Sequence, residues 1–191
     1  MHKGIKMEIV DLPGTYSLTA RAVDELIARN YILEENPDVV VDIIDASSIE
    51  RNLYLTMLLM ELEVQIVIVL NMIDIAKNKG YKIDMNKLST LLGVPIIPTI
   101  AIKKVGMEDL KDAILEATER EKKRHRHTVL SYGEDIEEII TKVTKIIEKD
   151  PKLVDLYPSR WLAVRLLEGD EDVLKRIDSS PNKEELLEAI Q

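Results

Sequence analysis

The sequence predicts an α/β protein, in which a mostly parallel sheet carries helices on both faces and a small all-α domain follows. Two observations support this prediction. Short runs of β-branched and aliphatic residues alternate with segments of helical periodicity as far as about residue 120, and helical periodicity alone continues from about residue 132. Alternating strands and helices are typical of parallel sheets, because each crossover between parallel strands needs a connection that packs on one face.

The first part of the chain contains four predicted strands, at residues 5–10, 39–44, 65–70 and 94–100. The first is predicted to be a buried strand. The second and third are almost entirely apolar, as expected for parallel strands that are buried on both faces. The fourth contains two prolines, which favours a position towards the edge of the sheet because proline cannot donate to a strand ladder.

Helices are predicted after these strands, at about residues 20–34, 50–63, 86–92 and 107–123. In the first of them, apolar side chains recur at helical spacing, which predicts its buried face: Val23, Leu26, Ile27 and Tyr31. A charged run at residues 120–127 then separates two predicted domains, residues 1–127 and 128–191. Basic side chains at this place are typical of a solvated helix end.

The second predicted domain contains helices only, at about residues 135–149, 161–167, 173–177 and 183–190. The first of these is amphipathic, with one apolar face made of Ile136, Ile139, Ile140, Val143, Ile146 and Ile147. Asp150 and Pro151 are predicted to end it. A domain of roughly 60 residues is close to the lower limit for independent folding, so we expect it to pack on the first domain.

The composition permits a hydrophobic core and excludes several classes of protein. Of the 191 residues 46% are hydrophobic, but there is no Phe and only one Trp, so Ile, Leu, Val and Met must form the core. The lack of cysteine excludes disulfides and thiolate sites. The net charge of −9 argues against nucleic acid as a partner. No apolar run approaches the roughly 20 residues that cross a bilayer, and no signal-peptide pattern opens the chain.

A D-x-x-G pattern, Asp11 to Gly14, follows the first predicted strand. In P-loop GTPases such a turn lies at the carboxyl end of a strand, where its aspartate holds Mg²⁺ and its glycine N–H meets the γ-phosphate. The same pattern also fits an ordinary strand-to-helix turn. A second pattern, N-x-x-D from Asn71 to Asp74, likewise ends a strand. The two patterns in this order predict a P-loop-GTPase-like fold.

The N-x-x-D pattern can read guanine. The Asp74 carboxylate can accept from the ring N1–H and the exocyclic amine together, a pair of donors that adenine lacks. Asn71 is expected to brace the neighbouring loop. The alternative is that Asp74 caps the helix that follows. After the last predicted strand, Ala101 occupies the place of an S-A-x turn whose backbone N–H meets the guanine oxygen in many G domains, with Ile100 in place of the usual hydroxyl residue.

The phosphate-binding pattern G-x-x-x-x-G-K-[ST] does not occur in the sequence. The motif order of P-loop GTPases therefore predicts roughly 40–50 further residues before Met1 in a complete G domain, including the central strand of the sheet. Two explanations remain open. Either the chain is a fragment, or its start was assigned at an internal methionine.

Several segments resemble the cytosolic G domain of the prokaryotic ferrous iron transport protein B (FeoB) family. The strings DLPGTYSL at residues 11–18 and ERNLYLT at residues 50–56 are more specific than general G motifs. Further matching residues are Asp24, Glu25, Ala28, Arg29, Asp45, Ala46 and the NMID string at residues 71–74. The resemblance covers about residues 5–120. The helical remainder is similar, with a weaker match, to the family's spacer domain, which resembles a GDP-dissociation inhibitor.

The resemblance implies the cytoplasmic, guanine-nucleotide-binding part of a ferrous iron transporter in the cell membrane. It implies GTP or GDP and Mg²⁺ as cofactors, with K⁺ as a further candidate, and slow GTP hydrolysis that regulates or drives Fe²⁺ uptake. A transmembrane permease domain outside this chain is the implied partner, and a homo-oligomer is left open. Two alternatives remain: a module that senses GTP or GDP without hydrolysing it, and an adaptor that has lost the nucleotide.

Residue by residue, the resemblance implies nucleotide-binding roles for Asp11, Gly14, Asn71, Met72, Asp74 and Ala101. In these roles Asp11 holds Mg²⁺ through water and Gly14 senses the γ-phosphate. The switch segment includes Leu12, Pro13 and Thr15. Thr15 stands where many G domains have a glutamine that orients water, and its shorter side chain predicts slow hydrolysis. No catalytic residue is assigned.

Overall fold

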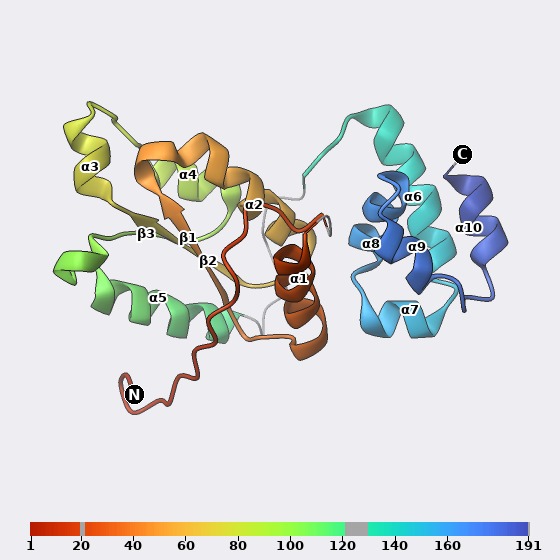
Figure 1. Cartoon of the computed structure of the whole chain (residues 1–191), viewed down its shortest axis with the longest axis horizontal. Helices are drawn as coiled ribbons and strands as arrows, with labels where there is room; N and C mark the ends of the chain where they lie inside the picture. Colours follow the sequence, from red (N-terminus) through yellow and green to blue (C-terminus); the bar gives the residue numbers. More distant parts are fainter. Residues whose placement is uncertain (20–21, 121–129, 191) are drawn as a thin grey trace. The chain divides into compact units, whose positions relative to one another are not determined.

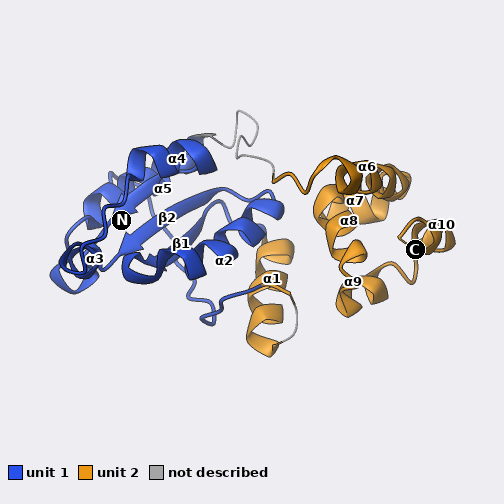
Figure 2. Cartoon of the chain, turned by 90° about the horizontal axis from the view of Figure 1, so that it is seen from above, with its two compact units in different colours: residues 1–17, 36–128 blue, residues 18–35, 129–191 orange. Residues whose placement is uncertain are grey.

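The computed structural model describes residues 1–19, 22–120 and 130–190. The chain divides into two compact units (Figure 2): residues 1–17 and 36–128 form the first, and residues 18–35 and 129–191 form the second. The first unit contains the sheet, and the elements of the second unit are all helical (Figure 1). Most of the charged run at residues 120–127 lies outside the described residues. None of the described helices is long and apolar enough to cross a membrane.

The sheet of the first unit is parallel, as the sequence predicts. Its described strands are β1 (Val40–Asp45), β2 (Ile66–Asn71) and β3 (Ile96–Pro98), in the order β1-β2-β3. The central strand β2 is buried along almost its whole length. The proline-containing strand β3 lies at an edge, where the missing proline N–H costs no ladder hydrogen bond.

Helices cover both faces of this sheet, which confirms the predicted fold class. On one face Val67 packs against Ala113 and Ala117 of α5 (Met107–Arg120). Asp42 is paired with Ile68 and therefore points to the opposite face, where it meets Thr56 of α2 (Ile49–Glu61). The unit also contains α4 (Met85–Leu92) and two short 3₁₀ helices, η1 (Ala46–Ser48) and η2 (Ala101–Lys103). A further helix, α3 (Ile73–Asn78), lies where the alternative interpretation of Asp74 placed one.

The strand predicted at residues 5–10 is not formed, and its predicted burial is wrong. Ile9 is 85% exposed, and the segment pairs with no strand in the part of the chain that is described. The predicted burial of β1 on both faces is also wrong in part, because Ile43 is 67% exposed. Residues 5–10 have no partner strand among the described residues, and a strand requires a neighbour to satisfy its backbone groups. Because β1 lies at an edge of the sheet, no further strand flanks Ile43 on its outer side.

The second unit joins α1 (Val23–Glu35) to α6 (Glu134–Ile147), α7 (Pro151–Leu156), α8 (Ser159–Leu167), α9 (Glu171–Arg176) and α10 (Lys183–Ala189). Its buried core consists mainly of Ile140, Val143, Ile147, Trp161, Leu162, Leu166, Val173, Ile177 and Leu186. Helix α7 is an addition to the predicted helices. The preceding helix α6 already ends at Ile147, before the predicted stop at Asp150 and Pro151. These two residues instead begin α7, because the Asp150 side chain accepts from the Lys152 N–H.

The predicted buried faces of two helices in this unit are partly wrong. On α1 the buried residues are Ala28, Arg29 and Ile32, whereas Val23 is 72% exposed. On α6, the outer part of the predicted face is about half exposed, at Ile136 and Ile139. Periodicity alone placed the α1 face incorrectly because a charged side chain, Arg29, is its most buried member.

One buried carboxylate lies within the first unit and away from the ends of the strands. Asp42 is 5% exposed and accepts a hydrogen bond of 2.5 Å from Thr56 Oγ1. Burial raises the pKa of Asp42 above its ordinary value, and the hydrogen bond from Thr56 opposes this rise. Folding therefore makes Asp42 hold its proton more tightly, so its contribution to stability is lost as the pH rises through the raised pKa.

We expect Asp42→Asn to raise the melting temperature at neutral pH, because an amide of the same shape removes the buried charge and still accepts from Thr56. The gain should disappear near pH 3, below the ordinary aspartate pKa, where Asp42 is protonated in both states. Thermal unfolding followed by circular dichroism at the two pH values measures the difference, with the exposed Asp38→Asn as control. A gain that persists in acid would contradict this assignment.

Candidate functional site

The candidate site lies at the carboxyl ends of β2 and β3, the edge where open parallel sheets bind ligands. Asn71 ends β2, and the chain that leaves β3 passes beside it. The Thr99 N–H donates to the Leu70 carbonyl at 2.9 Å, so the backbone of this loop continues from the sheet without a break. Thr99 is fully buried. The loop therefore has a fixed origin next to Asn71.

The Asn71 side chain joins the two strand ends. Its Oδ1 accepts from the Ala101 N–H at 3.0 Å and from Thr99 Oγ1 at 3.1 Å. A single amide oxygen thus holds two points of the loop after β3. A contact from the Ala101 N–H to a guanine oxygen remains a prediction. Because this N–H already donates to Asn71, such a contact requires a shared or exchanged hydrogen bond.

Met72 and Asp74 lie at the start of α3. Met72 has a left-handed backbone with φ of 58°, is 43% exposed, and precedes the first helical residue. Asp74 is the second residue of the helix, and its Oδ1 accepts from the N–H of Ile75 at 3.0 Å. Met72, not Asp74, therefore occupies the N-cap position of α3, and Asp74 contributes only a local hydrogen bond within the first turn.

The other oxygen of Asp74 meets a lysine that the sequence analysis did not single out. Lys103 Nζ lies 3.0 Å from Asp74 Oδ2. The ammonium group beside it lowers the pKa of the Asp74 carboxyl below its ordinary value. Asp74 is therefore a charged hydrogen-bond acceptor at neutral pH. No sequence pattern indicates this pair, because the two residues are 29 positions apart and lysine is common on protein surfaces.

The D-x-x-G residues lie in the exposed segment before α1. Asp11 and Gly14 are exposed, whereas Leu12 and Pro13 are half-buried. A Cβ added to Gly14 would meet no atom within 4 Å. Within the described residues, no hydrogen bond or ion pair joins Asp11 or Gly14 to the residues of the N-x-x-D motif.

The residues that follow Gly14 make contacts of their own. Thr15 Oγ1 donates to the Ser17 carbonyl at 2.6 Å and accepts from the Ser17 N–H at 3.2 Å. Its hydroxyl is thus held in a local turn. The Arg51 guanidinium of α2 lies 4.2 Å from the centroid of the Tyr16 ring, a cation–π contact that ties the segment to the first unit.

The donor set fits Mg²⁺ in one respect. Mg²⁺ retains several waters and is usually bound by one or two carboxylates together with substrate phosphates, rather than by a protein cage. Asp11 offers one exposed carboxylate. Among the residues that the structure describes, no group of three or more His, Asp or Glu side chains could enclose a metal. Asp11 is therefore suited to a magnesium ion that a nucleotide brings with it.

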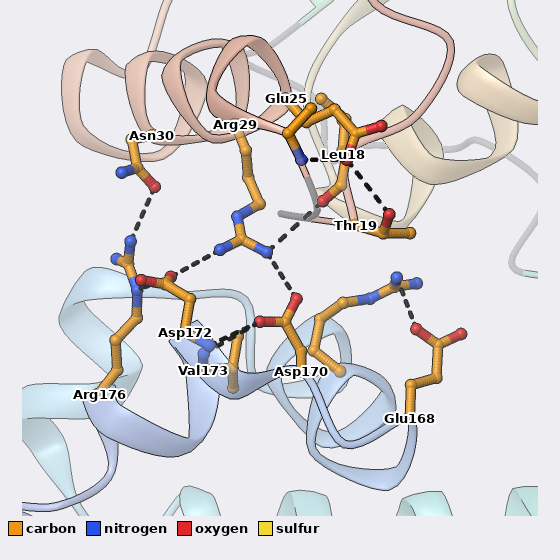
Figure 3. Close-up of polar contacts among 12 residues, drawn as sticks. Leu18, Thr19, Glu25, Arg29, Asn30, Glu168, Asp170, Asp172, Val173 and Arg176 are labelled. Atoms are coloured by element: carbon orange, nitrogen blue, oxygen red, sulfur yellow. Dashed lines mark hydrogen bonds and ion pairs between the residues drawn. The ribbon is translucent and has the colours of Figure 1, made fainter.

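Arg29 of α1, to which no sequence motif assigns a role, is fully buried. Figure 3 shows its contacts with Asp170 and Asp172. Its Nη1 lies 2.7 Å from Asp170 Oδ2, and its Nη2 lies 2.6 Å from Asp172 Oδ2. The guanidinium also lies 5.7 Å from the centroid of the Trp161 ring. Asp170 caps α9, accepting from the N–H groups of Asp172 and Val173.

Arg176 of α9 extends this network back to α1 (Figure 3). It donates to Asp172 Oδ2 through Nε at 2.7 Å and to Asn30 Oδ1 through Nη2 at 2.7 Å. The Leu18 carbonyl, at the end of the D-x-x-G segment, accepts from Arg29 Nη1 at 3.5 Å. The helix that follows the candidate switch is therefore fastened to the start of α9 by charged hydrogen bonds at several points.

Comparison with protein families gives two matches. The family model described as ferrous iron transport protein B matches residues 1–114, and the model of the FeoB cytosolic helical domain matches residues 132–191. The chain is 39% identical over 181 residues to the "Fe(2+) transport protein A/Fe(2+) transporter FeoB fusion protein" of Porphyromonas gingivalis, which covers 94% of this chain and 21% of that protein. It is 45% identical over 179 residues to the "Fe(2+) transporter FeoB" of Methanocaldococcus jannaschii, covering 94% and 26%.

Solved structures give the same picture. The cytosolic domain of the T. maritima FeoB iron transporter in its apo form aligns with a TM-score of 0.79 at 36% identity, covering 87% of this chain and 64% of that chain. The mGMPPNP-bound NFeoB of S. thermophilus aligns with a TM-score of 0.80 at 32% identity, covering 94% and 66%. The FeoB G domain from Methanococcus jannaschii is 54% identical, with a TM-score of 0.57 over 58% of this chain and 70% of that chain.

Proposed function

Since the chain belongs to the ferrous iron transport protein B family, we propose that it is the cytoplasmic, guanine-nucleotide-binding part of a ferrous iron transporter in the cell membrane. Residues 1–127 are its G domain, and residues 128–191 are its helical spacer domain. The chain spans only 21% of the length of the similar protein from Porphyromonas gingivalis. Its partner in the intact protein is a transmembrane permease domain, through which GTP binding and slow hydrolysis regulate or drive Fe²⁺ uptake.

The observation that supports guanine binding most strongly is the arrangement at the end of β2. Asn71 holds the loop after β3, and Asp74 presents a charged carboxylate beside it. A carboxylate can accept the N1–H and the amine of guanine together, and such charge-assisted pairs are among the stronger hydrogen bonds. Met72, exposed next to them, offers an apolar surface for one face of the base. The solved structure of the S. thermophilus relative NFeoB is mGMPPNP-bound, which supports the proposal that this chain binds guanine nucleotides.

On the phosphate side, Asp11 holds Mg²⁺ through water, and the Gly14 N–H contacts the γ-phosphate. When bound, Mg²⁺ supplies positive charge next to the phosphates. The segment from Gly14 continues through Leu18 into α1, and Arg29 fastens α1 to α9. A γ-phosphate that pulls on Gly14 therefore acts on a helix that belongs to the helical unit. This is the route by which the nucleotide state reaches the spacer domain.

The test compares hydrogen exchange across residues 14–34 in the intact transporter with GDP and with a non-hydrolysable GTP analogue. We expect greater protection with the GTP analogue, because only the γ-phosphate contacts Gly14 and a ligand shifts an equilibrium only through such differential contacts. In Gly14→Ala the two states should become alike while guanine affinity is retained. The added methyl group meets no protein atom, so this variant should fold normally. Equal protection in the wild-type protein would contradict a switch.

One observation favours the alternative of a sensor that does not hydrolyse GTP. The Thr15 hydroxyl, at the position where many G domains orient water, is held by both the carbonyl and the N–H of Ser17. A single-turnover measurement with GTP distinguishes the two functions. Phosphate release that depends on Mg²⁺ supports the slow GTPase, and retention of intact GTP supports the sensor.

A further inference from the structure

We propose that Lys103 acts as an internal competitor of guanine, holding the Asp74 carboxylate until the base replaces it. This inference rests on the proposed function, because it takes Asp74 as the acceptor for guanine. It adds a residue that sets how tightly the base is held. Lys103 lies in the loop after β3 and is part of neither the N-x-x-D nor the S-A-x motif.

Both oxygens of Asp74 have partners within the protein. Oδ2 is 3.0 Å from Lys103 Nζ, and Oδ1 accepts from the Ile75 N–H at 3.0 Å. Guanine presents two adjacent donors, which need both oxygens of one carboxylate in the plane of the base. The ammonium group of Lys103 already uses the oxygen that is free of the helix backbone, so guanine must share or take this oxygen.

The backbone of the loop places Lys103 near Asp74. Its N–H donates to the Ile100 carbonyl at 2.9 Å, and Ile100 and Val105 form an antiparallel bridge that closes the loop. Gly106 holds the base of the loop, with φ of +80°, and an added Cβ would lie 2.3 Å from the Pro98 carbonyl oxygen. Together with the contact from Ala101 to Asn71, these bonds fix where the Lys103 side chain begins.

The ion pair is suited to exchange. The Lys103 side chain is 59% exposed and that of Asp74 is 30% exposed, so water screens their attraction. Exposed pairs of this kind change an equilibrium constant by about fivefold or less. A guanine that supplies two hydrogen bonds to a carboxylate can replace such a partner, whereas adenine has no matching donor pair. Lys103 therefore weakens guanine binding by a small factor and leaves adenine binding unaffected.

The experiment titrates the ¹⁵N-labelled chain with guanosine, followed by NMR at the amides of Asp74 and Ala101. Guanosine is neutral, so any specific effect of salt on its binding reports on charges within the protein. The wild-type chain should bind guanosine more tightly as salt rises. Lys103→Met, which keeps the apolar stem, should bind up to about fivefold more tightly at low salt and lose this dependence. The neighbouring Lys104→Met, which leaves the ion pair in place, is the matched control.

Equal or weaker guanosine binding by Lys103→Met at low salt would overturn the inference and leave the proposed function intact. A wild-type affinity that does not change with salt would also overturn it. If neither the wild-type chain nor Lys103→Met shows saturable guanosine binding, guanine recognition itself fails, and the proposed function falls together with the inference. Adenosine titrated in parallel should give the same weak response in all three proteins.

Discussion

Asp74→Ala is expected to weaken GDP binding by about 2–4 kcal/mol, or roughly 30- to 900-fold, because it removes both acceptors for the guanine edge. The variant should fold normally. Asp74 is partly exposed, and Met72 rather than Asp74 precedes the first residue of α3. Isothermal titration with GDP measures the loss. An unchanged affinity would show that Asp74 does not read the base.

Two further proteins sharpen this test. Asp74→Asn should shift the preference from guanine towards xanthine, because an amide can donate to the 2-oxo group of xanthine and accept from its N1–H. Asp84→Ala is the matched control, since Asp84 lies in the same unit and only caps α4, accepting from the Lys87 N–H. It should lower stability slightly and leave the ratio of GDP to xanthosine diphosphate affinities unchanged.

Arg29→Met is expected to lower the free energy of unfolding of the helical unit by about 3–5 kcal/mol. The substitution keeps most of the apolar volume but leaves Asp170 with no opposite charge, and the Asp170 side chain is only 5% exposed. Asp172, which is more exposed, retains Arg176 as a partner. The cost therefore arises mainly from one buried carboxylate that loses its guanidinium.

Urea unfolding followed by the fluorescence of Trp161 measures this change, because Trp161 is the only tryptophan of the chain and lies over the Arg29 guanidinium. The control is Lys149→Met, which breaks the exposed ion pair with Glu185 in the same unit. It should cost less than about 1 kcal/mol. A loss of similar size in both variants would indicate that the Arg29 pair has no special role in fastening α1.

The Arg29 result bears directly on the proposed switch. If α1 separates from α9 in Arg29→Met, the spacer domain should no longer respond to the nucleotide at Gly14, even though guanine still binds at Asp74. The two variants thus separate recognition of the base from transmission of the nucleotide state. Each acts through a contact that the other leaves unchanged.

The sequence by itself determined the parallel sheet, most of the helices and the place of the N-x-x-D motif. These features depend on neighbouring residues: the apolar run before Asn71 forms β2, and a motif at the end of a parallel strand must lie at the carboxyl edge of the sheet. The prolines near β3 likewise predicted an edge strand. Local chemistry is sufficient where the structure follows from backbone preference and periodicity.

Only the tertiary structure decided which side chains meet across the chain. Arg29 and Asp170 are 141 positions apart, and nothing local to α1 indicates that a charged residue is the most buried on its face. The pairing of Lys103 with Asp74 depends in the same way on how the loop after β3 is anchored. The segment at residues 5–10 has the composition of a strand but no neighbour, and a strand forms only when another completes its hydrogen bonds.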